Sequence, residues 1–502
     1  MAEDLEATEQ KRRRVIWLQW VFAALGIFLL VRLAWWQLSP HPELISLAMG
    51  GIQKPSVIPA VRGSILDATG HYLAVTTVRY TVGVSPRLLT EAQKRELAPK
   101  LAQILGEPEE RIRQLLALDD REYVLLKREA PASARAEIEA LGPAAVAFNV
   151  EPKFRRLYPN GELAAHVLGF VGHEGRGEYG VEQYYEQELR GSDGQWGGIQ
   201  GPWGEQILAL PGKYKPVRDG ANLILTLDRN IQYVAESILR QGIKQNKASA
   251  GTIVVLDPRT GAILAMANYP AYNPQFYWRV EKPERYINTA VSALYEPGSV
   301  FKPLTLAAAL EARVIRPDDT YDDRGEIIVG GQRIKNSDRR AHGRTTMTGI
   351  LAHSLNVGAA YVATLLGPTR FYEMMRRFGF GEITGVDLAL ESGGLMRVPG
   401  DSLWHISDLG TNSFGQGIAV TPLQVVAAYA AIANDGVLMR PYIVSEICYG
   451  DHTERKQPFR VRRVISEQVA QEITQMMVDA VEIGMRKAVL PGYKFAGKSG
   501  TA

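Results

Sequence analysis

A long apolar segment near the amino terminus constrains this chain more than any other feature. Residues 15–38 are apolar apart from three polar side chains, and four consecutive cations at 11–14 precede them. A run of this length spans the hydrocarbon core of a bilayer when its charged ends extend towards the headgroups. Tryptophans lie near both ends, where an aromatic belt belongs. They are Trp17, Trp20, Trp35 and Trp36.

A signal peptide and a buried core helix both fit this segment less well than a membrane anchor does. A cleavable signal peptide has a shorter apolar core and a small-x-small cleavage site, whereas here Ala34 is followed by two tryptophans. A buried core helix does not normally carry four cations at its edge. We therefore predict a cytoplasmic tail over 1–14 and a single uncleaved anchor over 15–38. The positive-inside rule then places everything after Leu38 outside the inner or plasma membrane.

Composition excludes several classes of function. The net charge of +3, from 57 basic and 54 acidic residues, gives no case for a nucleic-acid partner. Cys448 is the only cysteine, so no internal disulfide is possible, and no Cys/His cluster has zinc spacing. We expect neither a metal nor a cofactor. A length of 502 residues indicates two or three domains.

After the anchor, the predicted pattern of strands and helices changes near residue 220. Residues 39–220 predict an irregular α+β domain: a linker to about 59, a hairpin over 62–75, helices over 91–105, 108–118 and 133–141, and a short strand over 123–126. Residues 221–502 predict an α/β domain in which helices pack on an antiparallel sheet. It begins with a strand over 221–227, a helix capped by Asp228 and ending at Leu239, and a hairpin over 251–257 and 262–267.

One pair of residues in this second domain could carry out a reaction. Pro297 and Gly298 predict a turn, and Ser299 follows at the N-cap or first turn of a helix. Lys302 lies one turn further on the same face, and the helix dipole there favours developing negative charge. A serine beside an amine base can attack a carbonyl. A serine cap followed by a surface lysine explains the pair as well, because S-x-x-K arises by chance roughly once in such a chain.

Two further short motifs have similar alternatives. Ser354 and Asn356 lie within an otherwise apolar, helix-forming segment over 351–362, so they line a cleft or cap a helix end. The chain ends on Lys498, Ser499, Gly500 and Thr501, which we predict to form a strand. Gly500 would let a ligand approach the strand backbone, and the hydroxyls beside it could bind a carboxylate. The alternative for Lys498 is a solvated charge at an edge.

The order of the three motifs is more specific than any one of them. S-x-x-K, then S-x-N, then K-[ST]-G is the signature of penicilloyl-serine transferases. With it, the chain resembles the class B penicillin-binding proteins, the peptidoglycan D,D-transpeptidases, over nearly its whole length. Further stretches that resemble the family are residues 295–299, 378–381 and 412–424, and boxes containing Arg62, Asp67, Arg156, Gly180 and Glu182.

The resemblance implies a fold and a function. It implies a non-catalytic, dimerisation-type pedestal over 39–220, whose charged boxes interlock, and a serine β-lactamase-like transpeptidase domain over 221–502. The enzyme would cross-link peptidoglycan stem peptides through an acyl-serine intermediate, and β-lactams would acylate it as substrate mimics. Residues 378–381 and 416–417 resemble the septal (division) type of the family slightly more than the elongation type. A lipid-II polymerase and other membrane proteins of division or elongation are the implied partners.

The resemblance also assigns catalytic roles. Ser299 would attack the terminal D-Ala–D-Ala bond, and Lys302, with a pKa lowered by burial and neighbouring cations, would take its proton. Asn356 would hold Lys302 and the donor backbone, Ser354 would relay a proton to the leaving amine, and Lys498 would supply positive potential.

Substrate binding is assigned to the last motif. Ser499 and Thr501 would hold the substrate carboxylate, with Gly500 between them. The backbone N–H groups of Ser299 and Thr501 would form the oxyanion hole.

Several alternatives remain at this point. A D,D-carboxypeptidase carries the same motifs, and a non-catalytic β-lactam sensor or scaffold of the wall-synthesis complex would keep the fold. A class A β-lactamase and a bifunctional penicillin-binding protein fit less well. In the family, further strands and a helix follow the third motif, so we expect strands missing after Ala502. The hairpin over 251–267 would then be unpaired, and the 502 residues alone unstable or inactive.

Overall fold

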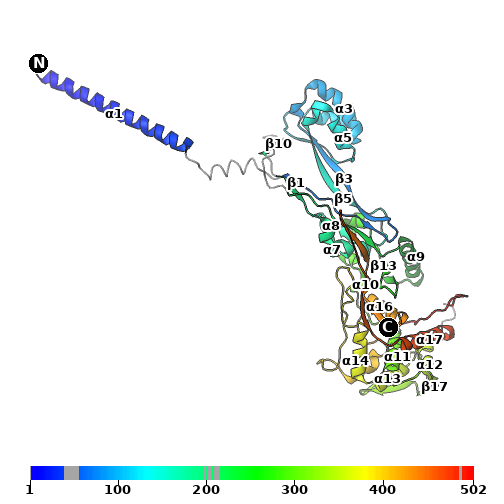
Figure 1. Ribbon diagram of the computed structural model, residues 1–502. Coiled ribbons are helices and arrows are strands. Elements are labelled where there is room, and N and C mark those ends of the chain that lie inside the picture. The colour runs from blue at the N-terminus through cyan, green and yellow to red at the C-terminus, as the bar shows by residue number, and fades with distance from the viewer. Residues whose placement is uncertain are drawn as a thin grey trace. The chain divides into compact units, whose positions relative to one another are not determined.

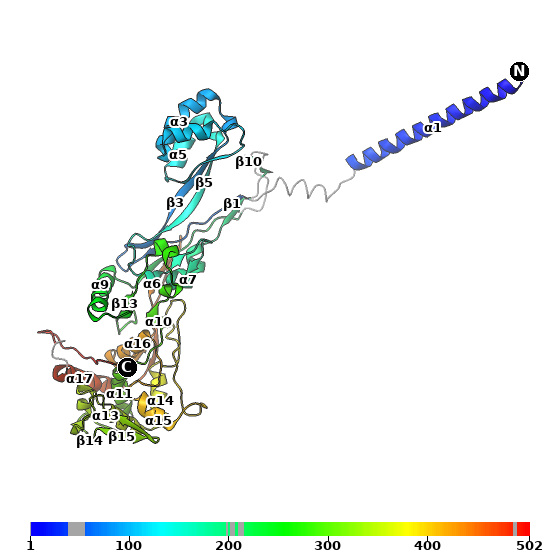
Figure 2. The ribbon, with the colours of Figure 1, turned by 180° about the vertical axis from the view of Figure 1, so that it is seen from behind.

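The computed structural model describes residues 2–38, 56–196, 199–200, 206–208, 215–484 and 489–501 (Figures 1 and 2). Its contacts divide the chain into two units, one of Met1–Pro59 with Asp193–Arg218 and one of Ala60–Ser192 with Asp219–Ala502. These units do not follow the predicted boundary at 220/221, which stays a prediction.

The smaller unit contains the predicted anchor. Helix α1 (Ala2–Leu38) includes a segment, Arg14–Gln37, whose mean hydropathy of 2.0 and 24-residue length suit a membrane span. Strand β1 (Ser56–Ile58) pairs antiparallel with β8 (Gly194–Trp196), and β9 (Ile199–Gln200) pairs with β10 (Gln206–Leu208). Most of the predicted linker, residues 39–55, lies outside the described residues.

A seven-stranded sheet organises the first half of the larger unit. Its order is β20-β19-β11-β2-β3-β4, with β5 also on β3, and only the β11–β2 pair is parallel. The strands are β2 (Ile65–Leu66), β3 (Tyr72–Val84), β4 (Val124–Ala130), β5 (Phe148–Leu157), β11 (Asn222–Leu225), β19 (Val444–Cys448) and β20 (Thr453–Arg455). The predicted hairpin and the predicted strand near 123–126 are confirmed, although β3 and β4 run further.

Helices cover one end of the long β3–β5 ribbon, as Figure 1 shows for α3 and α5. Helix α3 (Glu91–Leu105) has the predicted bounds, because Thr90 and Gln93 form a capping box and Gly106 ends the helix at φ +60°. Beside it lie α4 (Glu109–Leu116) and α5 (Ala134–Glu139). The remaining elements of this half are η1 (Pro86–Leu88), η2 (Gly142–Ala147), α6 (Ala165–Leu168), β6 (Phe170–Val171), β7 (Gly177–Glu178), α7 (Gly180–Tyr184) and α8 (Glu186–Arg190).

Charged residues from separate sequence stretches of this half form hydrogen bonds and ion pairs around a buried carboxylate, that of Glu182. Glu182 is 0% exposed and accepts hydrogen bonds from Arg62 Nε at 2.7 Å and Arg156 Nε at 2.7 Å. Burial alone would raise the pKa of Glu182, but the two guanidiniums hold it below its usual value. Arg156 also donates to the Gly63 carbonyl at 2.7 Å. The carboxylate of Glu182 thereby connects the segments that carry Arg62 and Arg156, which are far apart in the sequence.

We expect Glu182→Gln to destabilise the protein by about 3 kcal/mol or more, because it leaves the buried Arg156 without its counter-charge and Arg62 with Glu186 alone. Urea unfolding followed by circular dichroism measures this loss. Glu129→Gln is the control, since Glu129 and its partner Arg155 are 61% and 42% exposed, and such pairs contribute about 1 kcal/mol or less. Equal losses in the two variants would contradict a buried charge network.

The second half of the larger unit begins with a helix and a hairpin. Helix α9 (Arg229–Asn246) starts where Asp228 Oδ1 accepts from the N–H of Asn230 at 2.7 Å, as predicted, but ends seven residues after Leu239. The predicted hairpin is confirmed as β12 (Gly251–Leu256) and β13 (Ile263–Tyr269). Then come η3 (Pro274–Arg279), η4 (Pro283–Tyr286) and α10 (Thr289–Ser292).

A helical core completes this half, with α11 at its centre. Helix α11 (Lys302–Glu311) is buried from its first residue to Leu310 because its neighbours surround it. The other helices are α12 (Met347–Ala352), α13 (Asn356–Leu366), α14 (Pro368–Arg377), α15 (Ile406–Asn412), α16 (Pro422–Ala433) and α17 (Glu467–Gly484). Short antiparallel pairs lie at its edges: β14 (Thr320–Asp323) with β17 (Gly343–Thr346), β15 (Glu326–Val329) with β16 (Gln332–Lys335), and β18 (Val437–Met439) with β21 (Arg460–Arg463).

One predicted strand is wrong. Residues 489–501 carry the third motif and form no strand. A strand needs a neighbour to pair its backbone groups. Among the described residues, β12 and β13 pair only with each other, so the third motif is paired with neither strand.

Candidate active site

The turn that carries Ser299 is built by two glycines. Ser299 lies in η5 (Gly298–Phe301), a 3₁₀ turn that leads directly into α11. Gly298 has φ +59° and donates its N–H to the Gly415 carbonyl at 3.0 Å. A Cβ on Gly415 would fall 2.3 Å from the Gly298 carbonyl oxygen, so this close approach requires glycine. Ser299 lies in the first turn, as predicted, but no side chain caps η5 or α11. A capping role for Ser299 is therefore wrong.

Lys302 is a buried lysine surrounded by oxygens. Its Nζ lies within hydrogen-bond distance of four oxygens, Ser299 Oγ at 3.0 Å, Ser354 O at 2.6 Å, Ser354 Oγ at 3.2 Å and Asn356 Oδ1 at 2.9 Å. The residue is 0% exposed, and in the described part of the chain it forms no ion pair. Burial, followed by the charge of Lys498, lowers the pKa of Lys302 to about 7. A buried amine of this kind loses its proton near neutral pH.

The second motif does not lie inside one continuous helix over 351–362, as predicted, but at the junction of two helices. Helix α12 ends at Ala352, Ser354 adopts φ +57°, and α13 begins at Asn356. This left-handed residue breaks the helix and lets both the carbonyl and the hydroxyl of Ser354 reach Lys302. Because only glycine adopts this conformation readily, no feature of the local sequence predicted the break.

The third motif packs against the turn of Ser299. A Cβ on Gly500 would fall 2.8 Å from Val300 Cγ1 and 3.2 Å from the Pro297 carbonyl oxygen. Lys498 Nζ donates to the Ser499 carbonyl at 2.9 Å, and burial lowers the pKa of Lys498 to about 8. Ser499 and Thr501 are exposed. The first two motifs, which are far apart in the sequence, therefore meet at the Lys302 amine, and the third packs against the turn that carries Ser299.

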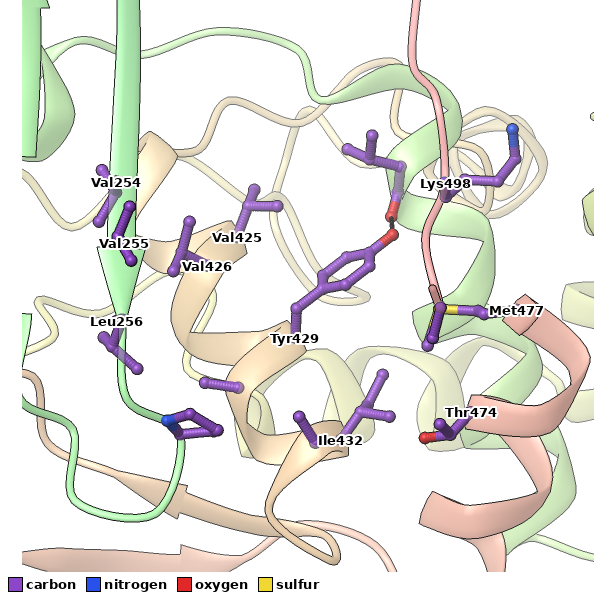
Figure 3. Close-up of a pocket in the computed structure, with 15 residues that line it drawn as sticks. Val254, Val255, Leu256, Val425, Val426, Tyr429, Ile432, Thr474, Met477 and Lys498 are labelled. Carbon is purple, nitrogen blue, oxygen red and sulfur yellow. Dashed lines mark hydrogen bonds between the residues drawn. The ribbon is translucent and has the colours of Figure 1, made fainter. Parts of the chain in front are cut away.

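A cavity of about 550 Å³ lies beside this site (Figure 3). Its walls are apolar side chains of β12, α16 and α17, and it shares Val300 and Lys498 with the surroundings of Ser299. Tyr429, which lines it, donates its hydroxyl to the Val300 carbonyl at 2.6 Å and so supports the turn. The sequence did not single out Tyr429, because this contact spans 129 residues.

Comparison with known proteins identifies the family of this chain. Residues 251–502 match the family described as "Penicillin binding protein transpeptidase domain", and residues 57–225 match "Penicillin-binding Protein dimerisation domain". Penicillin-binding protein PbpB of Mycobacterium tuberculosis is 33% identical over 496 residues, which cover 93% of this chain and 72% of the relative. The probable peptidoglycan D,D-transpeptidase PenA of Neisseria meningitidis is 30% identical over 454 residues, covering 90% and 75%.

A solved structure gives the same result. Penicillin binding protein 3 of Mycobacterium tuberculosis, complexed with aztreonam, superimposes with a TM-score of 0.67 at 30% identity, covering 89% of this chain and 82% of that one. The chain belongs to the class B penicillin-binding proteins, with a transpeptidase domain and the α+β fold expected of it.

Proposed function

We propose that Ser299 is the acyl-accepting nucleophile of a peptidoglycan D,D-transpeptidase and that Lys302 is its base. The observation that carries this assignment is the buried Lys302 amine, which has no counter-ion among the described residues and lies 3.0 Å from Ser299 Oγ. The relative from Neisseria meningitidis is named for the same activity. The substrate would be the terminal D-Ala–D-Ala bond of a stem peptide.

The surroundings of Lys302 orient its lone pair. The Ser354 carbonyl and Asn356 Oδ1 are acceptors only, so they take the two N–H groups of a neutral amine. The lone pair then points towards the hydroxyls of Ser299 and Ser354. The Ser299 hydroxyl can therefore donate its proton to Nζ as Oγ attacks the carbonyl carbon.

The remaining steps follow from the same groups. Backbone N–H groups of Ser299 and Thr501 would stabilise the oxyanion, and losing one such donor costs about 3 kcal/mol of barrier. The Ser354 hydroxyl would pass the proton to the departing D-Ala amine. Lys498 and the hydroxyls of Ser499 and Thr501 would hold the substrate carboxylate. An amine of a stem peptide on a neighbouring peptidoglycan strand would then attack the ester, form the cross-link and release Ser299.

The pH dependence of penicillin acylation tests this assignment. Since the neutral form of Lys302 is the base, we expect acylation to rise with a midpoint near pH 7. Lys498→Ala removes a like charge that lowers the pKa of Lys302, so the midpoint should move to higher pH. Stopped-flow fluorescence with a labelled penicillin measures both profiles. Lys494→Ala, at a nearby exposed lysine, is the matched control and should leave the midpoint in place. A midpoint that stays fixed in Lys498→Ala would contradict the coupling.

The location and partners form a second part of the proposal. The cationic start of α1 supports a cytoplasmic amino terminus, with the bulk of the chain outside the inner or plasma membrane. A septal role, with a lipid-II polymerase and other division proteins as partners, is supported by the family resemblance. Fluorescence microscopy of a tagged full-length protein should show it at the division site. A uniform signal along the side wall would contradict the septal role.

A further inference from the structure

The amide of Asn356 is oriented by a carbonyl from another segment. Its Oδ1 accepts from Lys302 Nζ at 2.9 Å, and its Nδ2 donates to the Lys335 carbonyl at 3.1 Å. A carbonyl can only accept, so the NH₂ group must face Lys335 and the oxygen must face Lys302. Lys335 is the last residue of β16. The orientation of the amide beside the base therefore depends on a strand outside the three motifs.

The helix that begins with Asn356 has no cap from its own segment. The N-cap position of α13 is Leu355, whose side chain offers no acceptor. The first backbone N–H groups of a helix need partners from elsewhere. Val357 N–H donates to Asn336 Oδ1 at 3.1 Å, across 21 residues of sequence. Asn336 thus acts as the cap, directly after the residue that orients Asn356.

Asn336 is itself held firmly. It is 2% exposed, and its Nδ2 donates to Asp323 Oδ2 at 2.8 Å and to the Arg340 carbonyl at 3.1 Å. Asp323 is 1% exposed and also accepts from the backbone N–H groups of Gly325 at 3.2 Å and His342 at 3.1 Å. Since both nitrogen contacts are to acceptors, Asn336 must present its oxygen to α13.

We propose that Asn336, anchored by Asp323, is a positioning residue for the catalytic lysine. It fixes the start of α13 and thereby holds Asn356 and the oxygens of Ser354 around the Lys302 amine. It does not contact Ser299. This inference rests on the proposed role of Lys302 as base.

Asn336→Ala should slow acylation by a labelled penicillin on the order of 100-fold, since small displacements of catalytic groups have effects of this size. The midpoint of its pH profile should also move to lower pH. The reason is that Asn356 Oδ1 would no longer be held against Nζ, and losing an acceptor disfavours the ammonium form. A merely structural role would reduce the folded fraction and leave the midpoint in place.

The matched control is Asn288→Ala. Asn288 is 6% exposed and caps α10, accepting from the Ala290 N–H at 3.2 Å. This variant should lower the melting temperature comparably but keep the parent acylation rate and pH midpoint. If both variants lose acylation alike with unmoved midpoints, the positioning role is wrong.

A milder variant decides the question if Asn336→Ala does not fold. Asp323→Asn can keep an oxygen for Asn336 and His342 but turns an NH₂ group towards the Gly325 N–H, which weakens the anchor of Asn336. It should slow acylation roughly fivefold, again with a lower midpoint. A parent rate and midpoint in the folded variant would overturn the proposal. Ser299→Ala separates the two hypotheses. If this variant is still labelled by the penicillin, the proposed function fails. If it is not labelled and Asn336→Ala behaves like the parent, the positioning role alone is refuted.

Discussion

Ser299→Ala is expected to abolish covalent labelling of the protein by a fluorescent penicillin. The variant lacks the only atom that would form the acyl bond, and the neighbouring Ser354 hydroxyl is held by Lys302 in a different position. Denaturing gel electrophoresis with fluorescence detection measures the adduct. The melting temperature should change little, because Ser299 Oγ supports no helix cap.

Ser445→Ala is a suitable control for this experiment. Its hydroxyl donates to the Ile224 carbonyl at 2.9 Å within the large sheet, and it belongs to none of the three motifs. Labelling at the parent rate is expected there. If Ser299→Ala were labelled as well as the parent, the nucleophile would have to be another residue.

Lys302→Met should change activity and stability in opposite directions. Acylation should fall by about 10² to 10⁴, the usual contribution of a positioned general base. The lysine also penalises folding, because the native state with a pKa of about 7 binds fewer protons than an unfolded lysine at 10.5. This penalty is complete below pH 7 and fades as the pH rises towards 10.5.

The difference in stability between Lys302→Met and the parent should therefore shrink with rising pH. Between pH 7 and 10.5 the expected change is up to about 5 kcal/mol. Urea unfolding at both ends of this range measures it. Lys244→Met, at an exposed position of α9, is the matched control. A flat difference for Lys302→Met would mean that the native lysine keeps its ordinary pKa.

Local patterns predicted the elements that local interactions determine. The bounds of α3 follow from a capping box and an αL glycine, and the start of α9 follows from Asp228. The hairpin of β12 and β13 joins two apolar runs through a short turn. The order of the three motifs, through the family it resembles, predicted that Ser299, Lys302, Ser354 and Asn356 lie together, as they do around Lys302 Nζ. The roles of Ser499 and Thr501 stay predictions.

The remaining features depend on contacts that no local pattern contains. Ser354 was placed in a helix because nothing nearby signals its φ of +57°. The cap of α13 comes from Asn336, and the counter-charges of Glu182 come from Arg62 and Arg156. The strand predicted for the third motif is absent because strand formation depends on a neighbour, which the motif itself cannot specify.

Mass spectrometry of the protein after reaction with a penicillin tests the central assignment most directly. The expected result is an added mass of one penicilloyl group, which peptide mapping assigns to Ser299. The adduct should form faster above the pKa of Lys302 than below it. An adduct on any other residue, or one that forms equally fast below and above pH 7, would contradict the assignment of Ser299 as nucleophile and Lys302 as base.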